Sequence, residues 1–101
     1  MVVRLTFIKI SSGEEENVRK IFRDKIIPEV KKQKGNIDIM LLHPFKENEE
    51  HISYTSWERK ADAEAYHTSG TYKKLVDMVK DSFADQPVLK SYTAEEASVH
   101  A

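Results

Sequence analysis

The sequence contains no cysteine. Disulfides, thiolate metal sites, iron–sulfur clusters and cysteine nucleophiles are therefore excluded, and a chain without disulfides fits a cytoplasmic location. There is also no excess of one charge, because sixteen Lys and Arg stand against seventeen Asp and Glu, a formal net charge of −1. We expect no binding to nucleic acid or to an anionic membrane surface, since both depend on a basic surface. The chain has no apolar run long enough to predict a membrane-spanning segment.

Glycine is scarce as well. The three glycines, Gly13, Gly35 and Gly70, stand at the boundaries of predicted elements. The sequence therefore lacks a phosphate-binding loop and a dinucleotide-binding glycine pattern, and it has no serine-elbow motif. Its 101 residues, 40% hydrophobic and 33% charged, are typical of one small folded domain. We expect that domain over residues 1–94 and a C-terminal tail over residues 95–101.

Four segments have the composition of β-strands. Residues 1–10 are rich in β-branched and aromatic side chains that partly alternate, and similar patterns predict strands over 36–43, 51–57 and 88–93. Both faces of the first strand carry apolar side chains, so we expect neither face to be simply solvated.

The segment between the first two strands has the periodicity of a helix. Its apolar stripe consists of Val18, Ile21, Phe22, Ile26 and Val30. Ser12 and Glu15 have the spacing of a capping box, which predicts the start of the helix. Pro28 removes an amide donor and predicts a kink or restart, and Gly35 marks the end.

A helix pair is predicted between the third and fourth strands. The first is a short alanine-rich helix over 60–67, and the second covers 71–83. The resulting βαββαβ order is that of the ferredoxin-like fold, an α+β architecture with helices on one face of an antiparallel four-stranded sheet. Its other sheet face remains bare and is apolar here. We therefore predict a homodimer that pairs two such faces.

Histidine is the residue type whose functional interpretation needs most care. His43, His51, His67 and His100 lack the spacing of metal ligands, so we expect no metal site. His67 ends the short helix. It is either a cation that favours the helix dipole or an acid–base group at the mouth of a pocket.

Two other residues also allow a structural and a functional interpretation. Trp57 ends the third strand, where it either fills the core or an interface or forms a platform for a ligand. Arg4 lies in a strand with the composition of a buried one. It either binds a carboxylate or an anionic ligand, or it extends its charged head into solvent.

Residues 52–75 read I-S-Y-T-S-W-E-R-K-A-D-A-E-A-Y-H-T-S-G-T-Y-K-K-L. They resemble the signature of the antibiotic biosynthesis monooxygenase domain family, in which a strand ends in Trp-Glu, a short helix follows, and a Ser/Thr-containing turn leads to an aromatic residue. The opening V-R-L-T-F-I-K-I-S-S-G-E-E-E and the ending S-F-A-D-Q-P-V-L-K-S-Y resemble the same family, so the resemblance covers residues 2–93. It implies a dimeric α+β barrel of two ferredoxin-like subunits.

Members of the family that this chain resembles differ in chemistry. Some are cofactor-independent monooxygenases of quinols or polyketide aromatics, in which the ionised substrate passes electrons to O₂, and others bind or degrade haem. The haem-degrading members use an Asn, a Trp and a His where this chain has Thr6, Tyr66 and Val76. Quinol-type members commonly have two histidines, and here His67 falls one residue beyond the first while Thr71 occupies the position of the second.

The resemblance implies a pocket between sheet and helices, lined by Arg4, Thr6, Trp57, Tyr66, His67, Tyr72 and Phe83. The leading hypothesis is a cofactor-independent monooxygenase of a small aromatic or quinol-like substrate. In it, Arg4 holds an anionic oxygen and His67 or Tyr66 assists deprotonation. We expect no cofactor. One alternative is a non-catalytic dimer that binds a small molecule or haem, another is a cofactor-free isomerase or lyase, and a third is a purely structural dimerisation module.

Overall fold

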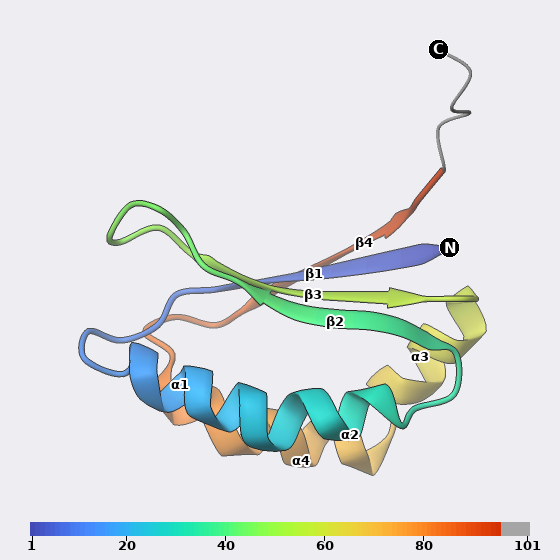
Figure 1. Cartoon of the computed structure of the whole chain (residues 1–101), viewed down its shortest axis with the longest axis horizontal. Helices are drawn as coiled ribbons and strands as arrows, with labels where there is room; N and C mark the ends of the chain where they lie inside the picture. Colours follow the sequence, from blue (N-terminus) through green and yellow to red (C-terminus); the bar gives the residue numbers. More distant parts are fainter. Residues whose placement is uncertain (96–101) are drawn as a thin grey trace.

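The computed structural model describes residues 1–95, so the tail expected at the C-terminus lies outside the described residues except for its first position. One antiparallel sheet contains the strands in the order β2-β3-β1-β4. The strands are β1 (Val2–Ile8), β2 (Asn36–Leu42), β3 (His51–Trp57) and β4 (Val88–Thr93). The α-helices are α1 (Glu15–Ile21), α2 (Ile27–Lys31), α3 (Lys60–His67) and α4 (Gly70–Val79). All of them lie on one side of the sheet, which confirms the predicted ferredoxin-like α+β fold (Figure 1).

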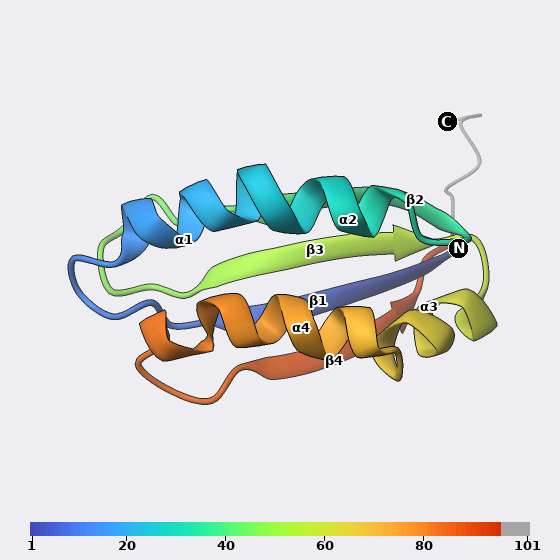
Figure 2. The same cartoon turned by 90° about the horizontal axis from the view of Figure 1, so that it is seen from below.

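The strand register decides which side chains meet the helices. Arg4 pairs with Thr55 across the β1–β3 ladder, and this pair faces the helical side. The next pair along, Leu5 and Tyr54, points to the open side because successive side chains in a strand alternate. The chain from α1 to α2 and the α3–α4 pair run across the same face of the sheet (Figure 2).

The core lies between these two layers. It is formed by Phe22, Ile26, Val30, Ile39, Trp57, Ala63, Leu75 and Val79. The predicted apolar stripe of the first helix is therefore the stripe that packs on the sheet. Among the described residues, no helix has both the length and the apolar character needed to cross a membrane.

A π-helical turn interrupts the first helical segment. It covers Phe22–Ile26 and joins α1 to α2 just before Pro28. Proline has no amide hydrogen, so the α-helical hydrogen bond to Asp24 cannot form there. The Ile27 amide donates instead to the carbonyl of Phe22, five residues back. The predicted restart at Pro28 takes this form.

The predicted capping box is wrong. Helix α1 begins at Glu15 with Glu14 as its N-cap, and no side chain caps it. Gly13 adopts a left-handed conformation with φ of 84°, and this turn leaves Ser12 outside the helix. The Glu14 carboxylate accepts a hydrogen bond from the hydroxyl of Ser82 at 3.2 Å. The start of α1 is thus held by a contact with the distant Ser82 and not by the predicted local contact between Ser12 and Glu15.

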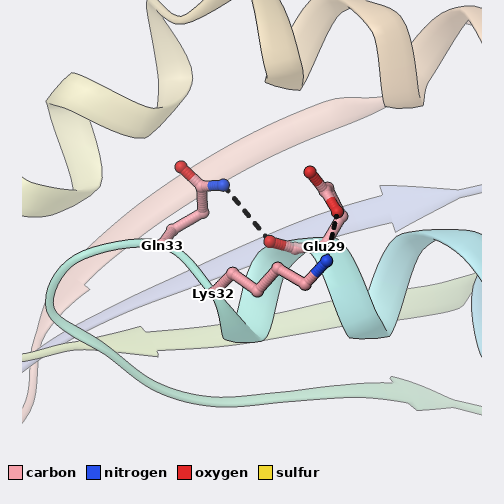
Figure 3. A network of polar contacts seen from close by, with 3 residues as sticks. All are labelled: Glu29, Lys32 and Gln33. Carbon is pink, nitrogen blue, oxygen red and sulfur yellow. Dashed lines mark hydrogen bonds and ion pairs between the residues drawn. The ribbon is translucent and has the colours of Figure 1, made fainter.

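Side chains of the two residues that follow α2 contact Glu29 in its last turn. The Gln33 amide donates to the carbonyl of Glu29 at 3.2 Å, and the Lys32 ammonium lies 3.4 Å from the Glu29 carboxylate (Figure 3). Gly35 follows with φ of 80°. A side chain there would collide with the carboxylate of Asp62, so both backbone and space require glycine.

The helix predicted over 71–83 is shorter than expected. Helix α4 ends at Val79, and a 3₁₀ turn over Lys80–Ser82 follows. Phe83, which was expected in the last helical turn, has an extended backbone and forms a β-bridge with Ile10. The helix therefore ends before its apolar periodicity does, because Phe83 pairs with Ile10 in the segment that follows β1.

Candidate functional site

A cavity of about 120 Å³ lies between the helices and the sheet. Six of the seven predicted site residues line it: Arg4, Thr6, Tyr66, His67, Tyr72 and Phe83. The rest of the wall is mainly aliphatic, with side chains from the first helical segment and from α4. The cavity is thus mainly apolar, with a few polar side chains in its wall, which is typical of small-molecule sites.

Two features of the chain bring the polar residues together. On β1, Arg4 and Thr6 are two positions apart and share the face toward the helices. Between α3 and α4, the Ser69 hydroxyl accepts from the Tyr72 amide at 3.2 Å and caps α4. This cap reverses the chain, so Tyr72 in the first turn of α4 returns to Tyr66 and His67 in the last turn of α3.

The aromatic rings of the site form a continuous cluster. The ring centroids of Tyr66 and Tyr72 are 5.4 Å apart in an edge-to-face arrangement, and those of His67 and Tyr72 are 4.5 Å apart. Such pairs fix ring orientation beyond what burial alone provides. The rings at the cavity wall are therefore held in place before any ligand binds.

Trp57 does not line the cavity. Its side chain is completely buried and stacks on Tyr66 with ring centroids 5.2 Å apart. The indole Nε1 donates to the Thr55 hydroxyl at 3.1 Å. Of the two interpretations of Trp57, the core-filling one describes its position, and its contact with the site passes through Tyr66.

Among residues 1–95, Arg4 is a cation without an ion-pair partner. Its side chain is half-buried, and its Nε atom is shielded from solvent with no hydrogen-bond acceptor. None of the ion pairs within residues 1–95 includes Arg4. Among these residues, no carboxylate lines the cavity. A buried donor left unpaired costs roughly 1–3 kcal/mol, so this wall of the cavity favours an incoming acceptor.

The environment gives the titratable residues different proton affinities. Burial lowers the pKa of His67, and the nearby charge of Arg4 lowers it further. Burial raises the pKa of Tyr66 far above its ordinary value, and it also raises the pKa of Tyr72. At neutral pH, His67 is therefore a neutral proton acceptor, while both tyrosines keep their protons.

The remaining described histidines lie away from the cavity. The rings of His43 and His51 meet edge to face, with centroids 5.1 Å apart. His43 follows the end of β2 and His51 begins β3, so the two residues lie at the two ends of the loop that joins these strands. His100 is outside the described residues. Within residues 1–95, no group of three or more His, Asp or Glu side chains is arranged to hold a metal ion.

Two hydroxyl residues of the site were not predicted. Ser53 and Thr55 of β3 line the cavity opposite Thr6 and Arg4. The alternation of side chains in β3 would have predicted them, because if Tyr54 faces the open side of the sheet, its neighbours Ser53 and Thr55 face the helical side. The aliphatic walls are a different case, since apolar periodicity predicts a buried face without revealing a gap in its packing.

One comparison with known proteins identifies a family. The sequence profile of the antibiotic biosynthesis monooxygenase family matches residues 1–78. No curated protein matches the chain. At the sequence identities of the solved structures that are similar to it, the likeness concerns the fold alone.

Three of these structures illustrate the likeness. A candidate antibiotic biosynthesis monooxygenase from Nitrosomonas europaea has a TM-score of 0.81 and 18% identity, over 93% of this chain and 98% of that one. A second candidate, from Bordetella bronchiseptica, has a TM-score of 0.83 and 14% identity, over 94% and 97%. A variant of MhuD with two manganese protoporphyrin IX molecules bound per active site has a TM-score of 0.80 and 19% identity, over 97% and 98%.

Proposed function

Because this chain belongs to the antibiotic biosynthesis monooxygenase family, we propose that it is a cofactor-independent monooxygenase of a small aromatic or quinol-like substrate. The observation that carries the proposal is one apolar cavity that brings together Arg4, a cation with no ion-pair partner among residues 1–95, a neutral imidazole, His67, and two phenols. A phenolic substrate needs a base to ionise it and a positive charge to stabilise the anion. The cavity wall contains both.

His67 is the base in this proposal. Its pKa lies below the ordinary value, so the imidazole is free to take a proton from a substrate hydroxyl at neutral pH. Arg4 faces the same cavity and stabilises the oxyanion that forms. Tyr66, with its strongly raised pKa, remains a hydrogen-bond donor and does not act as the base.

The redox balance requires no reductant besides the substrate. A hydroquinone that gains one oxygen atom and loses two hydrogen atoms becomes a hydroxyquinone, and the second atom of O₂ leaves as water. The ionised ring supplies the electrons. The apolar wall, which includes Val18, Phe22 and Ile26, keeps bulk water from the reactive anion.

A second copy of the chain covers the open face of the sheet in this proposal. Met40, Leu42, Val88 and Tyr92 point to that face, and each is more than a third exposed. They lie on the two edge strands, and Leu5 and Tyr54 on the central strands continue the apolar face between them. Such a face is typical of an interface. A two-fold dimer that pairs two such faces buries them and leaves both cavities on the outer, helical sides.

Haem fits this cavity poorly. Val76 lies in the wall, so the position that carries the iron-ligating His in the resembling haem-degrading proteins is apolar. The volume of about 120 Å³ is well below the roughly 300–1,000 Å³ of sites for larger ligands. The favoured alternative to oxygenation is therefore non-catalytic binding of a small molecule in the same cavity.

Oxygen uptake tests the proposal. Purified, metal-free protein is incubated with a panel of hydroquinones and polyphenols in a sealed oxygen electrode. We expect protein-dependent uptake that His67→Gln lowers by about 10²-fold, while His43→Gln, at an exposed histidine away from the cavity, retains full activity. If no panel member is oxidised although one binds, the protein is a binding protein and the oxygenase proposal is wrong.

A further inference from the structure

We propose that the ligand of this site carries a carboxylate, which binds side-on to the Nε edge of Arg4. This inference rests on the proposed function and narrows its substrate class to single-ring aromatic carboxylates, such as a dihydroxybenzoate. It begins with Arg4, which lines the cavity and whose Nε atom is shielded from solvent with no acceptor among residues 1–95.

The shape of the guanidinium favours a carboxylate over a single oxygen. Nε and one terminal nitrogen present two parallel N–H donors, which match the two oxygens of a carboxylate in a bidentate pair. A phenolate has one oxygen and leaves one of these donors without a linear partner. Because the Nε donor is already out of solvent, the unmatched group would stay unpaired at a cost.

Residues 1–95 supply no acceptor to the Nε atom of Arg4. Thr55 is the residue paired with Arg4 across the β1–β3 ladder, but its hydroxyl already accepts from the Trp57 indole at 3.1 Å. Within residues 1–95, the acidic side chains lie elsewhere than in the cavity wall. With His67 neutral, the site carries the single positive charge of Arg4, which a monoanionic ligand balances.

The size and lining of the cavity define the rest of the ligand. A volume of about 120 Å³ bounded by aliphatic side chains and the rings of Tyr66 and Tyr72 suits one flat ring. The carboxylate on Arg4 anchors that ring. A ring hydroxyl next to the carboxylate can then meet His67 while its oxygen stays beside the guanidinium, so Arg4 both anchors the carboxylate and stabilises the oxyanion.

Anaerobic calorimetric titration tests the inference apart from turnover. The probes are a dihydroxybenzoate with para hydroxyls, the matching dihydroxybenzamide and unsubstituted hydroquinone. We expect wild-type protein to bind the carboxylate at least about tenfold more tightly than the amide or hydroquinone. Arg4→Gln should abolish this preference. Arg4→Lys keeps the charge but lacks the planar fork, and should retain only part of it.

A matched arginine provides the control. Arg19 lies on the exposed surface of α1, where it pairs loosely with Glu16 at 3.9 Å, and Arg19→Gln should leave the preference unchanged. Equal wild-type affinities for the carboxylate and the amide would overturn the inference without any variant, and so would a preference that survives in folded Arg4→Gln. Oxygen uptake with hydroquinone alongside either result would leave the proposed oxygenase intact, whereas tight carboxylate binding without uptake would refute only the oxygenase.

Discussion

The two faces of the sheet are built from the same strands, yet polar side chains lie on the face that the helices cover and apolar side chains lie on the face that they leave open. The covered face contains Arg4, Thr6 and Thr55 within an apolar chamber. The open face presents residues such as Leu5 and Tyr54. Buried polar groups without partners indicate a ligand, and exposed apolar groups indicate a protein partner. The difference between the faces therefore separates the site of chemistry from the site of assembly.

Removal of Trp57 should have the largest effect on the covered face. The side chain is fully buried beneath Tyr66, so Trp57→Ala should lower the free energy of unfolding by about 3–5 kcal/mol. Urea titration measures this loss. Phe45→Ala, at a fully exposed aromatic residue of the hairpin, should change stability little. A loss below about 1 kcal/mol in Trp57→Ala would show that the site does not depend on this packing.

A charge on the open face should break the pairing of two copies. Tyr54 lies on the central strand β3 and points to that face. Tyr54→Glu should keep the fold but bury an unpaired carboxylate in any face-to-face dimer. Light scattering should give twice 11.7 kDa for the wild type and 11.7 kDa for the variant, with Lys34→Glu, at an exposed position, remaining dimeric. A wild-type monomer at every concentration would remove the second copy from the account.

The pH profile of oxygen uptake should sharpen the role of the covered face. A general base must be neutral, so activity should rise with pH through the pKa of His67 and level off above it. That pKa is lowered by burial and then by Arg4, so the acidic limb should lie below the ordinary range of histidine. Arg4→Gln should move the limb to higher pH, although its activity is reduced. An unmoved limb would assign the titration to another group.

Much of the covered face could be predicted from the sequence, because strand alternation is strictly periodic. The two-residue spacing of Arg4 and Thr6 places both on one face wherever β1 begins. The resemblance to the family added Tyr66 and Tyr72, which local patterns alone would leave at the edge of the core. The position of Trp57 required the tertiary structure, since a tryptophan at a strand end suits a core and a ligand platform equally well.

The errors arose where long-range contacts replaced local ones. Ser12 and Glu15 have the spacing of a capping box, but the left-handed turn at Gly13 and the bond from Ser82 to Glu14 set a later start for α1. Phe83 continues the apolar periodicity of α4, but it pairs with Ile10 instead. Neither contact leaves a trace in the local sequence, because the partners are distant along the chain.

Mapping a bound ligand onto the backbone amides tests the division between the two faces most directly. Isotope-labelled protein is titrated anaerobically with the dihydroxybenzoate and followed by two-dimensional NMR. The account predicts that the largest shift changes fall on residues of the cavity wall, Arg4, Tyr66, His67 and Tyr72 among them. Changes concentrated on Met40, Tyr54 and Tyr92 of the open face would contradict it.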